Sequence, residues 1–173
     1  MSVRQYGVLV SSPPKISLKK QLIDALSADL AMRERAYRAA RDAATDDEAK
    51  PENDKDTRAL EQSYLARGES RRIEELRTAL AEVQAMPLCD LADDEPAALG
   101  AVVTVRDQNE ATGRAASLFW LAPHGGGSRL GGAVQVLTPK SPMGRALLGK
   151  HVGDECEVVV AGATRTFAIV AMR

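Results

Sequence analysis

An acid-rich stretch that breaks helices lies between two long helical patterns in this chain. Residues 46–56, DDEAKPENDKD, hold six acidic residues against two lysines, and Pro51 and Asn53 interrupt any helix there. On each side, apolar residues recur at spacings of three and four over about 28 residues, which is typical of amphipathic helices. The pattern predicts two antiparallel helices joined at a tip rich in carboxylates.

The first helix is predicted over residues 17–45, with Ser17 as its N-cap. Arg33 stands at one of the places where the spacing requires an apolar residue. Because the apolar face narrows from leucines to alanines toward the tip, we expect the two helices to approach closely there. That face is formed by Ile23, Leu26, Leu30, Tyr37, Ala40 and Ala44.

The second helix is predicted over residues 57–85, and Pro87 ends it. Nearer the tip its apolar face is thinner, with Ala59 or Leu60 followed by Tyr64 and Ala66. Two such helices bury one seam and leave most of their surface in water, which indicates that the length of the pair matters. The clear part of the seam is formed by Ile73, Leu76, Leu80 and Val83.

Residues 87–98 are interpreted as a linker, and residues 99–173 as an antiparallel β domain with one short helix. Ser141 is the expected N-cap of that helix, Pro142 its first residue and Gly149 the residue that closes it. Residues 123–132 are expected to form a loop. The strands are predicted at residues 101–106, 117–121, 133–137, 155–160 and 165–172, the last two as a hairpin across Ala161-Gly162.

Charge and cysteine content exclude several classes of protein. The formal net charge is −1, so a general nucleic-acid binder is not expected. Cys89 and Cys156 fit no metal or redox spacing and are interpreted as free thiols. The first residues lack an apolar run of the length of a signal peptide or membrane span, so we expect a cytoplasmic protein that contacts no membrane.

Residues 141–158, SPMGRALLGKHVGDECEV, resemble the signature of the Gre transcript-cleavage factors of bacterial RNA polymerase. The segment Arg72-Ile73-Glu74-Glu75-Leu76 is also similar, whereas residues 46–56 match less well. The resemblance is to a divergent GreA/GreB-like branch. It implies an α+β fold in which a coiled-coil hairpin, residues 1–86, precedes an FKBP-like C-terminal domain.

The resemblance also implies an activity shared with a partner. Gre factors insert their hairpin through the secondary channel of RNA polymerase, where two tip acids help to hold magnesium and backtracked RNA is hydrolysed. Counting back from Arg72-Ile73 places the two acids at Glu52 and Lys55, and a slip of one residue replaces Lys55 by Asp56. Glu52 and Asp56 are therefore the expected pair, with Asp54 in reserve.

Because magnesium requires more oxygen ligands than such a tip offers, the isolated protein is expected neither to bind the ion nor to act as an enzyme. The resemblance further implies contact between the protein, polymerase and nascent RNA. Arg38 and Arg41 either contact phosphates of extruded RNA or form an ordinary solvated helix face. Ser141 and Pro142 are expected to dock on polymerase, with Lys140 where an acid often precedes Ser-Pro in the family. We expect a monomer when the protein is free.

Three alternatives stay open. A Gre-like factor could occupy the secondary channel without stimulating cleavage, through its altered tip. The FKBP-like half suggests a stand-alone peptidyl-prolyl isomerase, although an aromatic content of 3% argues against a proline pocket with aromatic walls. A structural coiled-coil adaptor is the third alternative.

Overall fold

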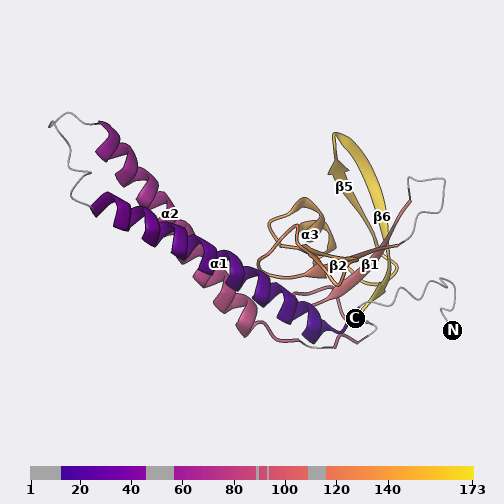
Figure 1. The fold of residues 1–173 in the computed structure, drawn as a ribbon. Coiled ribbons are helices and arrows are strands. Elements are labelled where there is room, and N and C mark those ends of the chain that lie inside the picture. Colours follow the sequence, from indigo (N-terminus) through magenta and orange to yellow (C-terminus); the bar gives the residue numbers. More distant parts are fainter. Residues whose placement is uncertain (1–12, 46–56, 89, 93, 109–115) are drawn as a thin grey trace. The chain divides into compact units, whose positions relative to one another are not determined.

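The computed structural model of the chain describes residues 13–45, 57–88, 90–92, 94–108 and 116–173. These residues form two long helices, followed by a six-stranded sheet with one short helix (Figure 1). The predicted α+β order of helices and then strands is confirmed. The chain separates into two compact units, one combining Met1–Leu22 with Glu82–Arg173 and the other comprising Ile23–Ala81.

The long helices are α1, Lys15–Thr45, and α2, Thr57–Ala85. The bounds predicted for α2 are confirmed. The start predicted for α1 was two residues too late, because the carbonyl oxygen of Pro14 already accepts hydrogen bonds from the backbone nitrogens of Ser17 and Leu18. Ser17 therefore lies inside the first turn rather than at the N-cap.

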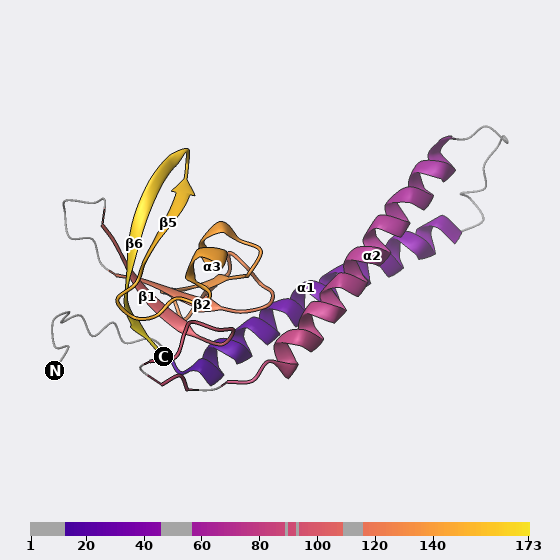
Figure 2. The same ribbon diagram turned by 180° about the vertical axis from the view of Figure 1, so that it is seen from behind.

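α1 and α2 run antiparallel, as predicted. Lys19 near the start of α1 contacts the end of α2 at Gln84, whereas Arg33, farther along α1, contacts Glu69. Both views show the two helices side by side over their length (Figures 1 and 2). The eleven residues that connect Thr45 to Thr57 lie outside the described residues, so the position of the predicted turn is not described.

The seam of the helical pair differs in detail from the predicted stripes. On α2, Ala79 is buried while Leu80 is half-buried. The buried position that the sequence pattern assigned to Leu80 is therefore taken by the small side chain of Ala79. Tyr64 and Leu65 are 69% and 74% exposed, so the prediction that Tyr64 faces the other helix was wrong. Tyr64 lies nine residues before the buried Ile73, about two and a half helical turns, and is therefore on the opposite side of the helix. The buried residues of α2 are Ile73, Leu76, Ala79 and Val83.

The sheet has the order β3-β4-β2-β1-β6-β5 and is mixed rather than wholly antiparallel. β2 and β4 pair in parallel, with Leu118 opposite Val134 and Leu121 opposite Leu137. The connection of about a dozen residues between them brings the chain back to its starting edge, which a tight hairpin could not do. The strands are β1 (Val102–Asp107), β2 (Ser117–Leu121), β3 (Arg129–Leu130), β4 (Val134–Leu137), β5 (Glu155–Val160) and β6 (Ala163–Met172).

The short strand β3 was not predicted, because its residues fall in a segment rich in glycine that was interpreted as a loop. The predicted hairpin of β5 and β6 is confirmed. Its turn consists of Ala161 at φ 51° and Gly162 at φ 81°. Two positive φ values in a two-residue turn match the right-handed twist of the flanking strands.

The core of the β domain lies between the sheet and α3, Pro142–Leu147. Trp120 is fully buried and its indole nitrogen donates to the carbonyl oxygen of Gly100 at 3.2 Å. Ala97, within the segment interpreted as a linker, is buried and its backbone nitrogen donates to the carbonyl oxygen of Lys150. The domain therefore uses residues upstream of its first strand.

Candidate functional site

The three acids predicted to carry chemistry, Glu52, Asp54 and Asp56, lie outside the described residues. The structure describes the helix on either side of this segment: α1 ends at Thr45 and α2 begins at Thr57. Within the described parts of the chain, no three His, Cys, Asp or Glu residues form a group that could hold a metal ion. The proposal of a magnesium site thus concerns residues 46–56 alone, whose carboxylates are hard oxygen donors of the kind that magnesium prefers.

Charged residues, in addition to apolar ones, hold the helical pair together. Arg33 donates to Glu69 of α2 at 3.1 Å and to Asp29 of its own helix at 3.0 Å. The hydrogen bond to Glu69 and the charge of Asp29 raise the pKa of Arg33 above its ordinary value. The arginine at an apolar place of the sequence pattern is therefore an interhelical contact.

A second charged contact joins the helices through Arg77. Its guanidinium donates to Glu34 of α1 at 2.6 Å and to Glu74 of its own helix at 2.5 Å. The hydrogen bond to Glu34, and then the charge of Glu74, raise the pKa of Arg77. Arg33 of α1 bonds to Glu69 of α2, whereas Arg77 of α2 bonds to Glu34 of α1. Each helix therefore contributes one arginine to the contact between them.

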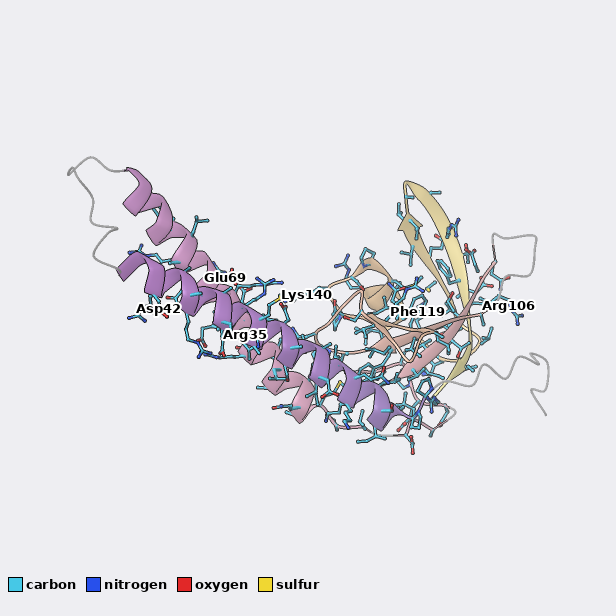
Figure 3. All side chains as sticks on the ribbon, viewed as in Figure 1. Arg35, Asp42, Glu69, Arg106, Phe119 and Lys140 are labelled. Carbon is cyan, nitrogen blue, oxygen red and sulfur yellow. The ribbon has the colours of Figure 1, made fainter. Side chains whose placement is uncertain are left out.

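The arginines predicted to contact RNA, Arg38 and Arg41, are both exposed on α1. Arg38 lies 3.7 Å from the carboxylate of Glu34, one turn earlier, and also donates to the carbonyl oxygen of Glu34 at 3.3 Å. Figure 3 labels Arg35 and Asp42 on the same helix and Glu69 on α2. The carboxylate of Glu34 thus lies beside Arg38, so the positive charge of Arg38 is partly compensated.

Ser141 and Pro142 occupy the predicted positions at the start of α3. The Ser141 hydroxyl accepts from the backbone nitrogen of Gly144 at 3.0 Å and donates to the carbonyl oxygen of Thr138 at 2.9 Å. Pro142 is the first residue of the helix and is exposed, and Gly149 follows the last turn at φ 77°. The capping prediction is confirmed, and the exposed proline is available for contact.

Contacts near the start of α1 and the end of α2 were not predicted from the sequence. The Lys19 ammonium donates to the carbonyl oxygens of Gln84 and Met86 at 2.8 and 2.7 Å, where α2 has carbonyl groups without helical partners. His124, assigned to a loop, lies 2.8 Å from Glu82. The partners are more than forty residues apart along the chain, so no local spacing could have indicated them.

Two further groups of the β domain have shifted pKa values. The backbone nitrogen of His151 donates to Asp154 and is the main cause of the lowered pKa of that carboxyl group. Burial raises the pKa of the Cys156 thiol, and the charge of Lys150 offsets this in part. A buried thiol that stays protonated is a poor nucleophile, which agrees with the interpretation of Cys156 as a free thiol without a metal or redox role.

Comparison with known families identifies the class of the β domain. Residues 92–173 match the family described as "Transcription elongation factor, GreA/GreB, C-term". Residues 92–173 are therefore similar to the C-terminal domain of GreA/GreB factors, which confirms the resemblance noted at residues 141–158. No curated protein matches the chain as a whole or in part.

Solved structures with a similar course of the chain include Gfh1 of Thermus aquaticus, at 22% identity and a TM-score of 0.40, covering 90% of this chain and 96% of that one. The GreA factor homolog 1 of Thermus thermophilus gives 21% identity and a TM-score of 0.38, with coverage of 87% and 94%. A GreA/GreB factor of Nitrosomonas europaea gives 21% identity and a TM-score of 0.36, with coverage of 56% and 77%.

Among the described residues, no helix combines the length and apolar character needed to cross a bilayer.

Proposed function

We propose that this protein binds bacterial RNA polymerase in the cytoplasm, inserts its helical pair into the secondary channel and stimulates cleavage of backtracked RNA. The observation that carries the proposal is the presence, in one chain, of a GreA/GreB C-terminal domain and two helices of 31 and 29 residues. At 1.5 Å per residue each helix is about 45 Å long. A pair of that length, with six acids in the connection, suits delivery of carboxylates into a deep site.

The proposed role of this chain in the chemistry is to supply carboxylate oxygens. Glu52 and Asp56, with Asp54 in reserve, would complete the oxygen shell of a magnesium ion held mainly by polymerase and RNA phosphate. When bound, the ion supplies activation of water and neutralisation of charge at the scissile phosphodiester. Water attacks the phosphorus, the P–O3′ bond breaks with a proton passing to the departing 3′ oxygen, and the RNA 3′ fragment is released with a 5′-phosphate. The protein itself is unchanged and is expected to be inert without polymerase.

The proposal is tested with a polymerase complex stalled in the backtracked state. Glu52→Gln and Asp56→Asn keep the side-chain shape and remove the charge, so each is expected to abolish most of the stimulated cleavage while binding to polymerase is retained. Asp24→Asn, at an exposed position of α1, is the matched control and is expected to leave cleavage unchanged. The proposal would be contradicted if the protein did not raise cleavage above the intrinsic rate of polymerase at any magnesium concentration.

A second candidate function is occupation of the channel without cleavage, in competition with other factors that use it. Lys55 favours this candidate, because the resemblance places the second acid of the pair at that position. Wild-type protein that binds polymerase but never raises cleavage above the intrinsic rate would select this function. The acids of residues 46–56 would then act by their charge in the active centre.

A further inference from the structure

β5 is an edge strand of the six-stranded sheet, and its outer side is open. Among the described residues it pairs with β6 alone, from Glu155 opposite Ala168 to Val160 opposite Ala163. Figures 1 and 2 show the hairpin of β5 and β6 extending from the rest of the sheet. An edge strand of six residues presents backbone N–H and C=O groups to which a further strand can bond.

A hydrogen bond of β6 establishes which residues of β5 point outward. The carbonyl oxygen of Thr166 accepts from the backbone nitrogen of Gln108 at 2.9 Å, so the backbone of Thr166 points away from β5. Its register partner Glu157 therefore points away from β6, because both residues of a non-hydrogen-bonded pair turn their backbone groups outward. The same direction recurs at every second residue of a strand. The outward N–H and C=O groups thus belong to Glu155, Glu157 and Val159.

The side chains of these three residues lie on the exposed face of β5. Cys156 and Val158, at the positions between them, are buried in the core, whereas Val159 is 65% exposed. Glu155 and Glu157 are also exposed, and neither forms an ion pair within the described parts of the chain. Their partners and that of Val159 on β6 are the uncharged residues Ala168, Thr166 and Thr164. The edge therefore offers two carboxylates and one apolar side chain at alternate positions.

A second copy of β5 fits this edge poorly. Antiparallel pairing of Glu157 with Glu157 of another copy places two carboxylates directly opposite, and pairing of Glu157 with Val159 places them at diagonal positions. Pairing of Val159 with itself avoids the carboxylates but extends into the turn at Ala161-Gly162, where positive φ values end the strand. Because like charges on neighbouring strands destabilise a sheet, the edge is suited to a strand of opposite charge.

We propose that the outer edge of β5 binds an extended, basic protein segment as an additional antiparallel strand. In that segment an apolar residue lies against Val159, and basic residues two and four positions later lie against Glu157 and Glu155. Main-chain hydrogen bonds of an added strand supply affinity, and its alternate side chains supply specificity. A nucleic acid is disfavoured because its phosphates repel the two carboxylates. The inference concerns the β domain and does not depend on the proposed function.

The test follows backbone amide exchange by nuclear magnetic resonance in the isotope-labelled full-length protein. The amides of Glu155, Glu157 and Val159 are expected to exchange faster than those of Cys156 and Val158, because only the latter bond to β6. The peptide acetyl-TVTKTKT-amide is expected to slow exchange of the three outward amides several-fold and to leave the two inward amides unchanged. The peptide acetyl-TVTETET-amide carries the opposite charge and is expected to give no protection.

Further reagents separate strand addition from attraction between charges. N-methylation of the first lysine of the basic peptide removes the N–H that bonds to Glu157 but keeps the charge, so it is expected to abolish protection. Glu157→Lys is expected to weaken protection by the basic peptide and to allow protection by the acidic one. Asp94→Lys makes the same change of charge at an exposed residue outside the sheet and is expected to behave like the wild type. If Glu157→Lys lowers the melting temperature, Glu157→Gln replaces it and is expected to weaken protection by the basic peptide.

Three results would overturn the inference. Absence of protection by the basic peptide would mean that Glu155 and Glu157 only shield the edge from pairing. Equal protection by the methylated peptide would mean that charge attracts the peptide without strand addition. Protection of the outward amides when the protein alone is concentrated would assign the edge to a second copy of the chain. All three results leave the proposed function intact, because the experiment contains no polymerase.

Discussion

The two compact units of this protein are stabilised by different means. In the β domain, Val103, Leu121 and Ile169 are buried within one continuous core cluster. In the unit Ile23–Ala81, burial is confined to one seam, and ion pairs of Arg33 and Arg77 supplement it. The stability of the β domain depends on the hydrophobic effect, which salt does not screen. The stability of the unit Ile23–Ala81 depends in part on ion pairs, which salt screens.

The difference agrees with the separate roles that the proposed function gives to the β domain and the helical pair. In the β domain, the fully buried Leu147 fixes α3 against the core, so the exposed start of this helix has a rigid support. Under the proposed function the helical pair enters the secondary channel of polymerase, where further packing layers would add to its thickness. The two helices keep a single seam and gain cohesion from exposed charged residues instead.

The largest expected effect is on the core of the β domain. Leu121→Ala removes a fully buried side chain and is expected to cost about 3 kcal/mol of unfolding free energy, within the usual range for such truncations. The fluorescence of the single tryptophan, Trp120, reports this domain during urea denaturation. Leu99→Ala, at a side chain that is 44% exposed, is the control and is expected to cost far less. Equal costs would mean that the core assignment is wrong.

A smaller effect is expected on the helical seam. Ile73→Ala removes a buried side chain from a seam bounded by water, so the expected cost is about 2 kcal/mol, at the low end of the range. Far-UV circular dichroism should detect the loss of helix while Trp120 fluorescence changes little. Leu65→Ala is the matched control at an exposed position of α2. Coincident loss of both signals would show that the two units unfold together.

The start of α3 allows a comparison, within the β domain, between the role of a residue in folding and its proposed role in binding. Pro142→Ala relaxes the backbone of the unfolded chain and is expected to cost at most about 1 kcal/mol of stability. Binding to polymerase is expected to weaken several-fold, because the exposed proline ring that is expected to dock on polymerase is lost. Pro96→Ala, also at an exposed proline, is the control. Parallel losses of melting temperature and affinity would favour a purely structural role for Pro142.

Much of the fold was predictable because its signals are local. The bounds of α2 follow from a helix-breaking segment and Pro87, and the start of α3 follows from Ser141 and Pro142. The hairpin of β5 and β6 follows from Ala161-Gly162. In each case a residue type with a restricted backbone or a capping side chain marks the boundary.

The features that were missed depend on contacts between distant residues. The parallel pairing of β2 with β4 depends on how the connecting loop returns, which strand composition does not encode. Lys19 and His124 find partners at the end of α2 that no spacing indicates. For the acids Glu52, Asp54 and Asp56, composition predicts the chemistry of the segment but not the direction of each side chain.

The smallest expected effect concerns the ion pair between Arg33 and Glu69, which joins side chains that are 30% and 36% exposed. Partly exposed pairs contribute little and are screened by salt. Arg33→Met is therefore expected to lower the midpoint of thermal helix loss slightly at low salt, and the difference from wild type should shrink in concentrated sodium chloride. A double-mutant cycle with Glu69→Gln isolates the pair, and Arg35→Met, at an exposed residue of the same helix, is the control. The loss caused by Leu121→Ala should persist at every salt concentration, because burial of apolar surface is not weakened by screening. If the Arg33 and Leu121 variants respond alike to salt, the two units do not differ in the way that their contacts indicate.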